Sequence, residues 1–421
     1  MKVLIIGAGL GGLACAVSCR RANLDVIILE KSSAAAEIGA GIQIPPNGAT
    51  VLKELGLLPQ IIEKGSVVQH IDFRRYESGA LIRSMPLGDG IVRDFGVPWV
   101  IIHRQDFHQV LLNEATRLGA VLRLDTEVTD IIFEEREVVL VGGERVRGDV
   151  IIGADGLYSR TRDLVLSSPT PPLETGDLAY RATFTRSQLE ELNDPDVVEL
   201  CRRIAVTSWL GPDKHTIFYP VRGGREFNLV LLRPDNLEKG VRRVQGDIDE
   251  MRESYAGWDE TLRKLISCVS AVSKWKLTHL PELETWTAGP VALLGDACHP
   301  TLPYQAQGAA MAVEDGFAIG KLLGQLDASG PSDPETRIPD VLKLYETIRK
   351  ARTTRNVQAA MRNRRVFHIA DGLLQTARDF VLGYVGMTRQ SDWTYLFSWR
   401  MRAMLRHDLA GDCERAFEDI K

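Results

Sequence analysis

The sequence predicts an α/β protein in which a Rossmann-like domain carries an inserted, mostly antiparallel sheet domain of the α+β kind and a helical C-terminal segment. The first observation is a short apolar run, Val3–Ile6, that leads into a glycine-rich turn and then into the helical periodicity of Leu10–Ala22, as in a βαβ unit. The second is a change after about residue 170, where several strand-like runs follow one another. The third is the apolar run Val291–Leu294, which returns the chain to the first domain.

These observations divide the chain into four segments. The nucleotide-binding domain is expected in two parts, residues 1–172 and 281–340, with the sheet domain at 173–280 between them and the helical segment at 341–421. The cluster Ser167–Pro172, rich in serine and proline, marks the first boundary.

Apolar runs of roughly four to eight residues predict the strands. In the first domain they are Val3–Ile6, Asp25–Leu29, Val97–Ile102 and Val150–Ala154, with Val121–Leu124, Val128–Phe133 and Val138–Val141 as a small meander. In the inserted domain they are Leu178–Phe184, Ile204–Leu210, Thr216–Pro220 and Phe227–Leu232. Helical spacing predicts helices at 49–55, 103–118, 247–270, 308–326 and 340–366. The arginines of the last helix, among them Arg349 and Arg352, are expected to form a solvated face, with an anion site as the alternative.

Composition and charge exclude several classes of function. Lysine and arginine number 51 and aspartate and glutamate 56, which leaves a net charge of −5 and no basic field for nucleic acid or an acidic membrane. The six cysteines are scattered without a CxxC pair, so we expect buried thiols and predict no metal site. A buried strand from Val3 argues against a secretory signal, and no apolar run reaches the ~18 residues of a membrane span. A cytoplasmic enzyme is therefore expected.

A glycine motif lies between the first strand and the first helix. In Gly7-x-Gly9-x-x-Gly12 the first glycine permits a tight turn, the second lets the backbone approach a pyrophosphate, and the third allows close packing of helix on strand. Glu30 follows Gly12 by 18 residues, close to the spacing of an acid that binds ribose hydroxyls, and Lys31 stands beside it. The motif predicts a dinucleotide site.

A second motif follows the strand Val291–Leu294. Asp296, next to Gly295, comes directly after a buried strand end, where a carboxylate either accepts sugar hydroxyls or caps its own turn. Gln307, Gly308 and Ala309 then open a helix whose N-terminal N–H groups and dipole suit an anion, such as a negatively charged ring.

Three motifs occur in one order: the glycine loop, Gly153-Ala154-Asp155-Gly156, and Gly295-Asp296. With them, and with the stretches Gly39–Asn47 and Pro303–Gly308, the chain resembles the single-component, class A flavin-dependent aromatic hydroxylases, especially their salicylate hydroxylase-like branch. The resemblance covers essentially residues 1–340, and the C-terminal segment matches only loosely.

The resemblance implies non-covalently bound FAD, with NADPH or NADH as a transient electron donor. It implies that Asp296 binds the ribityl chain, that the loop Pro303–Ala309 lines the isoalloxazine ring, and that Asp155 lies at the pyrophosphate. Arg104 matches the family's arginine for the FAD phosphates, a role that suits a bidentate guanidinium, although Phe107 stands where the family commonly has leucine.

The resemblance further implies an NAD(P)H- and dioxygen-dependent monooxygenase that hydroxylates a phenolic ring through a flavin C4a-hydroperoxide. The alternatives are a monooxygenase that epoxidises or hydroxylates a larger fused-ring metabolite, and a non-catalytic flavoprotein. Halogenation is disfavoured because the Trp-x-Trp-x-Ile-Pro signature is absent, and Ser-His-Asp hydrolysis because no Gly-x-Ser-x-Gly elbow occurs. Decarboxylation, the choice of nicotinamide donor and a homodimer stay open.

Candidates for the substrate side are fewer. Arg181 is expected either to pair with a substrate carboxylate or phenolate, or to form a salt bridge between domains. His215 and Tyr219 are four residues apart on a strand and so share a face, and they resemble a pair that holds the ring oxygen in some ring hydroxylases. His215 is then a candidate base, with a structural role as the alternative. Pro303 is expected beside the reacting ring, whereas His299 is expected to be a turn residue. The aromatic tail around Trp393 and Trp399 is expected either to cover the site or to form a dimer contact.

Overall fold

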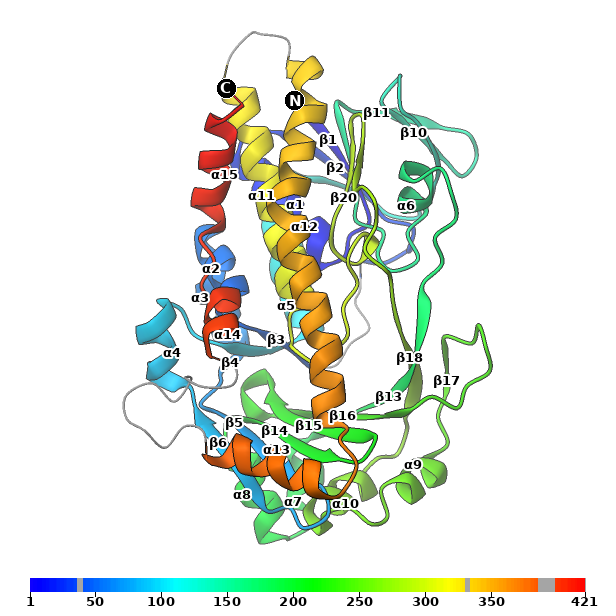
Figure 1. The fold of residues 1–421 in the computed structure, drawn as a ribbon. Coiled ribbons are helices and arrows are strands. Elements are labelled where there is room, and N and C mark those ends of the chain that lie inside the picture. Colours follow the sequence, from blue (N-terminus) through cyan, green and yellow to red (C-terminus); the bar gives the residue numbers. More distant parts are fainter. Residues whose placement is uncertain (36–40, 330–333, 385–397, 421) are drawn as a thin grey trace.

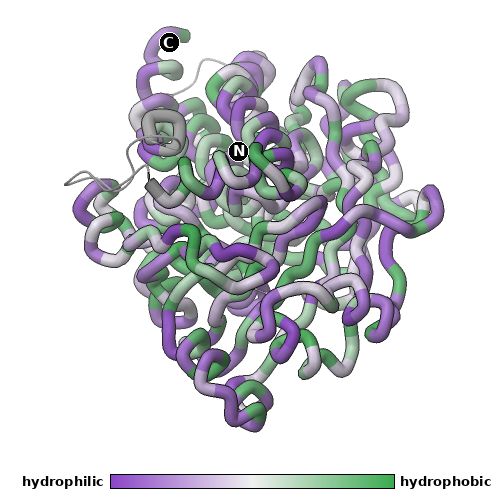
Figure 2. Tube along the Cα trace, turned by 60° about the horizontal axis from the view of Figure 1, so that its bottom comes forward, coloured by the Kyte–Doolittle hydropathy of each residue, from purple (hydrophilic) through white to green (hydrophobic). Residues whose placement is uncertain are grey.

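The computed structural model describes residues 1–35, 41–329, 334–384 and 398–420. It has two main sheets, one in the upper and one in the lower half of Figure 1, and the long helix α12 (Pro334–Phe367) runs beside both. Hydrophobic stretches cross the interior and hydrophilic residues gather in the outer loops (Figure 2).

The upper sheet has six strands in the order β19-β20-β12-β1-β2-β8. These strands are β1 (Lys2–Ile6), β2 (Asp25–Leu29), β8 (Val121–Arg123), β12 (Val150–Gly153), β19 (Thr287–Ala288) and β20 (Val291–Leu293). Only β19 pairs antiparallel with its neighbour in this sheet. Val3, Leu4 and Ile5 have no exposed surface, as expected of a parallel strand covered on both faces. The predicted Rossmann-like core is confirmed.

Helix α1 (Leu10–Arg21) packs on this sheet, and α5 (Arg104–Arg117) and α11 (Gly308–Ala328) pack against α1. Glycines one turn apart let α11 approach the backbone of α1. A Cβ at Gly316 would stand 2.5 Å from the amide nitrogen of Cys15, and one at Gly320 would stand 2.3 Å from Ser18 Oγ. This close contact brings the segment after residue 295 next to the N-terminal glycine loop.

The lower sheet has eight strands in the order β17-β18-β13-β16-β15-β14-β5-β6. They are β5 (His70–Arg75), β6 (Leu81–Pro86), β13 (Leu173–Thr185), β14 (Ala205–Gly211), β15 (Lys214–Val221), β16 (Glu226–Pro234), β17 (Arg243–Gln245) and β18 (Ser273–His279). All neighbours are antiparallel except β5 and β14. A second hydrophobic core joins it to α8 (Pro195–Arg202), α9 (Ile248–Ser254), α10 (Glu260–Ser267) and the short α7 (Arg186–Glu190).

Two smaller sheets and several short helices complete the fold. A three-stranded sheet joins β3 (Gly41–Ile44), β7 (Val100–His103) and β4 (Ser66–Val67), and another joins β9 (Val128–Ile132), β10 (Glu137–Leu140) and β11 (Arg145–Arg147). The short helices are α2 (Pro46–Glu54), α3 (Leu58–Lys64), α4 (Gly88–Phe95) and α6 (Arg160–Val165).

The C-terminal segment is helical where the structure describes it, with α13 (Leu373–Tyr384), α14 (Ser398–Leu405) and α15 (Leu409–Glu418). Helix α15 packs against α11 and α12, and Cys413 and Phe417 join the core of the first domain. Trp393 and the side chain of Trp399 lie outside the described residues. The prediction that the aromatic tail covers the site or forms a dimer contact therefore falls outside the described structure. Within the described part, no helix combines the length and apolarity needed to cross a bilayer.

Two expectations about the strands were wrong. Val121–Leu124 is not part of a meander, because β8 pairs in parallel with β2 and extends the upper sheet. The lower sheet also takes β5 and β6 from a region that the sequence analysis assigned to the first domain, since His70–Arg75 pairs with β14. Strand β13 begins at Leu173, where the inserted domain is expected to start.

Candidate active site

The glycine loop has the geometry that its sequence predicts. Gly7 has φ +106°, and a Cβ there would stand 2.5 Å from the carbonyl oxygen of Ala154. A Cβ at Gly12 would stand 2.1 Å from the oxygen of Gly7. Gly9 is the N-cap of α1 and offers no side-chain hydrogen bond to the first N–H groups of the helix. Those donors are available to a phosphate, as at other nucleotide-binding helices.

A cavity that we call the nucleotide chamber adjoins this loop. Its volume is about 410 Å³, and its lining includes Glu30, Lys31, Arg104, His108 and Asp155. Glu30 accepts hydrogen bonds from the N–H of Ala8 (2.8 Å) and Ser32 (2.9 Å). Burial alone would raise the pKa of Glu30, but these N–H donors outweigh burial and hold the pKa below its usual value. The carboxylate is therefore ionised at neutral pH.

Two side chains of this chamber hold its walls together. His108 donates from Nε2 to the carbonyl of Ala8 (2.8 Å). Sequence reasoning missed this contact. The signal that could have indicated it is the spacing of four residues, which places His108 on the same face of α5 as Arg104. Asp155 accepts from Ser159 Oγ (2.5 Å), the N-cap of α6, and from the N–H of Thr161 (2.9 Å) in the first turn of that helix. Asp155 thus lines the chamber and also fixes the turn that follows β12.

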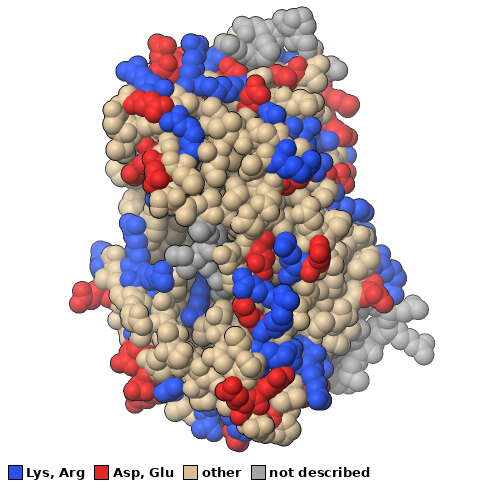
Figure 3. Space-filling model, turned by 180° about the vertical axis from the view of Figure 1, so that it is seen from behind, with Lys and Arg blue, Asp and Glu red and all other residues tan. Residues whose placement is uncertain are grey.

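A second cavity, the ring chamber, joins the two domains. It measures about 390 Å³, and its lining includes Gly9, Arg104, Asp296, Pro303 and the start of α11 from Gln307 to Ala309. Asp296 lies in the short 3-10 turn Gly295–Ala297 and has an exposed side chain. Figure 3 shows the back of the molecule hollowed at mid-height, with basic side chains at the edge of the hollow. The structure therefore brings the predicted nucleotide-binding residues of both parts into two adjoining chambers.

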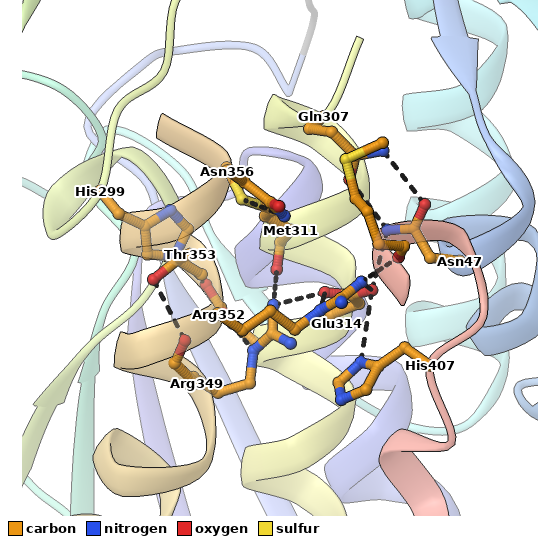
Figure 4. Close-up of polar contacts among 12 residues, drawn as sticks. Asn47, His299, Gln307, Met311, Glu314, Arg349, Arg352, Thr353, Asn356 and His407 are labelled. Carbon is orange, nitrogen blue, oxygen red and sulfur yellow. Dashed lines mark hydrogen bonds and ion pairs between the residues drawn. The ribbon is translucent and has the colours of Figure 1, made fainter. Parts of the chain in front are cut away.

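A buried amide pair supports the N-terminus of α11 (Figure 4). Asn47 donates through Nδ2 to Gln307 Oε1 (2.9 Å) and to Glu314 Oε1 (2.8 Å), and Gln307 donates back to Asn47 Oδ1 (3.2 Å). The side chain of Gln307 thus contacts protein, while the residue itself lines the ring chamber.

Two acids in α11 pair with two arginines of α12. Arg349 lies 2.6 Å from Glu314 and 2.7 Å from Asp315, and Arg352 lies 3.1 Å from Glu314. Burial works to raise the pKa of Glu314, but the two arginines hold it well below its usual value. The expectation that Arg349 and Arg352 face solvent was wrong, because α12 packs on α11 and these acids require counter-charges in the interior.

The same network fixes the turn that carries Asp296. Asp315 Oδ2 accepts from the N–H of Gly295 (2.9 Å) and from Nε2 of His299 (2.5 Å). Cys298, His299 and Asp315 bring their ligand-type atoms within 4.8 Å of one another. Because Asp315 already pairs with His299 and Arg349, and burial raises the pKa of the Cys298 thiol, we assign this trio to the ionic network.

The three substrate-side candidates of the second domain lie in different surroundings. Arg181 and Tyr219 line the ring chamber, and the Tyr219 ring lies against Gly41, where a Cβ would stand 2.3 Å from Cε2. Burial lowers the pKa of Arg181, and its guanidinium lies 5.8 Å from the ring centre of Trp275.

His215 lines neither chamber in the described structure. Its Nδ1 is 2.8 Å from Nε2 of His368, and its ring lies 5.2 Å from that of Tyr304. Burial lowers the pKa of His215 well below the usual value, so the imidazole is uncharged. Its contacts support the loop at Pro303.

The loop from Pro303 to Ala306 is held from the side of α12. Tyr304 donates to Asp177 (2.8 Å), which also pairs with Arg364, and Asn363 donates to the carbonyl of Tyr304 (3.2 Å). Ala306 has φ +56°, a left-handed conformation that is unfavourable for alanine.

A third, smaller cavity lies on the other side of this loop. We call it the apolar cavity; it measures about 100 Å³ and shares Gln43, Ile217, Pro303 and Ala306 with the ring chamber. Its remaining walls are Ile71, Phe73, Met85, Trp99, Val206, Ser208, Tyr304, Gln305, Asn363, Phe367 and Met404. Sequence reasoning missed these residues, because they come from elements scattered between β5 and α14 and form no local motif.

Comparisons with known proteins agree with this geometry. The family model described as FAD binding domain matches residues 1–360. The chain belongs to this family of FAD-binding proteins, as a class A flavoprotein aromatic monooxygenase. FAD is its cofactor, and NAD(P)H is the co-substrate typical of the family. The predicted resemblance is confirmed, and the alternative of a non-catalytic flavoprotein is dropped.

Particular relatives extend over most of the chain. It is 39% identical over 384 residues to "FAD-dependent monooxygenase OpS4" of Beauveria bassiana, which covers 90% of this chain and 88% of the relative. It is 34% identical over 402 residues to "3-hydroxybenzoate 6-hydroxylase 1" of Aquipseudomonas alcaligenes, covering 94% and 96%. A solved salicylate hydroxylase substrate complex has the same fold, with TM-score 0.80, 22% identity and coverage of 99% and 98%.

Proposed function

We propose that this enzyme hydroxylates a phenolic or related ring bound in the apolar cavity. NADH or NADPH supplies two electrons, dioxygen supplies the oxygen atom that enters the ring, and the second oxygen atom leaves as water. The observation that supports this proposal is the adjacency of the two cavities, which share four lining residues.

The residues of the two chambers fit FAD. The glycine loop and Arg104 suit the phosphates, Glu30 with Lys31 suits the adenosine ribose, and Asp296 suits the ribityl hydroxyls. The N-terminus of α11, from Gln307 to Ala309, suits the negative charge of a reduced ring. When bound, FAD supplies the electron transfer and the activation of dioxygen.

The protein's own contribution is to position the ring and exclude water. The loop from Pro303 to Ala306 separates the cofactor side from the substrate side and is clamped through Tyr304 and Asp177. We assign Arg181 and Tyr219 to contacts in the ring chamber, and His215 to positioning the loop through Tyr304. A dry cavity limits loss of reduced oxygen as hydrogen peroxide.

The test is oxidation of NADH and NADPH by the yellow holoenzyme with a panel of aromatic compounds and a parallel peroxide assay. Stimulated oxidation with little peroxide, and a product 16 mass units heavier (one oxygen atom), is the expected result. A panel that never stimulates donor oxidation, although FAD stays bound, would contradict the proposal.

We also propose a cytoplasmic site of action, and small molecules and a second copy of this chain as the partners, in agreement with the net charge of −5, which gives no field for nucleic acid. The proposed homodimer is tested by light scattering of the holoenzyme, for which a mass of twice 46.7 kDa is expected.

A further inference from the structure

The apolar cavity has uncharged walls. As far as the described residues form it, its lining contains no lysine, arginine, histidine, aspartate or glutamate. Its polar side chains are those of Gln43, Trp99, Ser208, Tyr304, Gln305 and Asn363. A carboxylate buried among such groups loses its hydration without gaining a counter-charge, which is strongly unfavourable.

The nearest charged groups are already engaged or lie elsewhere. Arg364 pairs with Asp177 behind Tyr304, and Arg181 lines the ring chamber and not the apolar cavity. The histidine pair next to Phe367 is neutral, because burial lowers the pKa of His215 well below its usual value and that of His368 to about 4. None of the described cations lines this cavity, and the four groups named above are not placed to hold an acid in it.

Two residues that line the cavity each carry a buried polar atom without a partner among the described residues. Trp99, 5% exposed, has an indole N–H without an acceptor, and Gln305 has a buried Oε1 without a donor. Buried polar groups are normally satisfied, and each unpaired one is costly. A ligand that carries one acceptor and one donor satisfies both.

The volume of the apolar cavity limits the size of the ligand. The cavity measures about 100 Å³. An engineered apolar cavity of about 150 Å³ holds one benzene molecule, so the present space suits one six-membered ring better than a fused ring system.

We propose that the substrate is a small, uncharged, single-ring aromatic compound with one hydrogen-bond acceptor for Trp99 and one donor, such as a phenolic hydroxyl, for Gln305. This inference rests on the proposed hydroxylase function and narrows it. Acceptance of a phenolic O–H by Gln305 orients the ring and raises its electron density, so that the protein needs no charged base there. An aromatic carboxylate, and hence decarboxylating hydroxylation, is disfavoured.

The first experiment compares isosteric ligands that differ in charge. The holoenzyme is titrated with 3-hydroxybenzamide and with 3-hydroxybenzoate, and binding is measured from the change in flavin absorbance. We expect the amide to bind at least about tenfold more tightly than the acid, because only the acid buries an unpaired charge. Resorcinol is expected to bind more tightly than 2-naphthol. Tighter binding of the acid, or of naphthol, overturns the corresponding part of the proposal.

Variants then identify the contacts. Trp99→Phe keeps the shape but removes the donor, and we expect it to weaken 3-hydroxybenzamide binding about 3- to 10-fold. Trp286→Phe is the matched control, because its indole N–H is also buried and unpaired in the described structure but lies beside His299, away from the cavity. Met85→Lys adds a cation to a half-buried wall position and is expected to favour the acid over the amide. Equal losses in both tryptophan variants contradict the role of Trp99.

Ligand binding and NAD(P)H oxidation, measured separately, distinguish a failure of this inference from a failure of the proposed hydroxylase function. If neutral rings bind tightly but none stimulates NAD(P)H oxidation, the recognition proposal stands and the proposed function fails. If the acid binds more tightly and Arg181→Met abolishes that preference, the acid is held in the ring chamber and the recognition proposal is wrong.

Discussion

Substitution of Arg349 tests the ionic network that supports the proposed FAD site. The side chain has no exposed surface, and it lies 2.6 Å from Glu314 and 2.7 Å from Asp315, which are equally buried. Arg349→Met keeps a long unbranched side chain but removes the charge that both carboxylates share. The substitution therefore leaves the two buried carboxylates with less positive charge to balance them.

The size of the loss in stability depends on the ion pairs that remain in Arg349→Met. Breaking a buried ion pair by removing one partner costs about 3–5 kcal/mol. Arg352 still lies 3.1 Å from Glu314, and His299 still lies 2.5 Å from Asp315. We expect the lower end of that range, a loss of about 3 kcal/mol in the free energy of unfolding at pH 7.

The loss in the free energy of unfolding should become smaller as the pH falls. The pKa values of Glu314 and Asp315 lie below the ordinary 4.5 and 3.8, because their arginine and histidine partners outweigh burial. In the native protein their contribution is complete above these ordinary values and is lost as the pH falls through the depressed ones. In Arg349→Met the carboxylates take up protons at higher pH, so the difference between variant and native protein should shrink as the pH falls from 7 towards 4.5.

Urea unfolding followed by circular dichroism measures this difference on native and variant protein. The matched control is Arg355→Met, because Arg355 lies on the same helix, is exposed and, among the described residues, donates only to its own helix at Ala351 (3.0 Å). The control should change stability by less than about 0.5 kcal/mol. Equal effects of the two substitutions, or a difference that grows on acidification, would refute the reasoning.

Three further predictions concern the cofactor and the loop. Asp296→Ala should weaken FAD binding by about 10- to 100-fold, the loss of one or two hydrogen bonds to a charged acceptor, and FAD retention at wild-type level contradicts the site. Gly12→Ala places a Cβ 2.1 Å from a backbone oxygen and should abolish FAD incorporation, whereas Gly257→Ala, which faces open space, should leave it unchanged. Asp177→Asn weakens the clamp on Tyr304 by about 1–2 kcal/mol and should raise the share of NAD(P)H oxidation that yields peroxide; an unchanged share argues against the clamp.

The nucleotide-binding part could be predicted from the sequence because its signals are local. Gly7 has a positive φ, Gly12 approaches the oxygen of Gly7 within the same loop, and Asp296 follows a recognisable buried strand end. Each such motif encodes its own geometry, so the spacing was enough to place it. The pairing partner of Val121–Leu124 depends on the whole topology of the sheet, and the spacing carried no information about it.

The substrate side could not be predicted in the same way. Trp99 and Met404 are about three hundred positions apart, yet both line the apolar cavity, and no periodic pattern connects them. Arg349 was misjudged for a related reason. The side chains of an arginine-rich helix normally face water. Only the packing of α12 on α11 shows that Arg349 is buried, where it pairs with Glu314 and Asp315.

The order of strands in the upper sheet also bears on how the protein is made. Strand β1 pairs with β2 almost at once, but β12 receives its other neighbour, β20, only when residues 291–293 have been synthesised. At a translation rate of about 5–20 residues per second, the interval between the end of β12 and the end of β20 is on the order of 7–28 s. During this time the open edge of the sheet is exposed and a nascent-chain chaperone has a surface to shield. The segments that line the ring chamber can therefore come together only after the start of α11 has been synthesised.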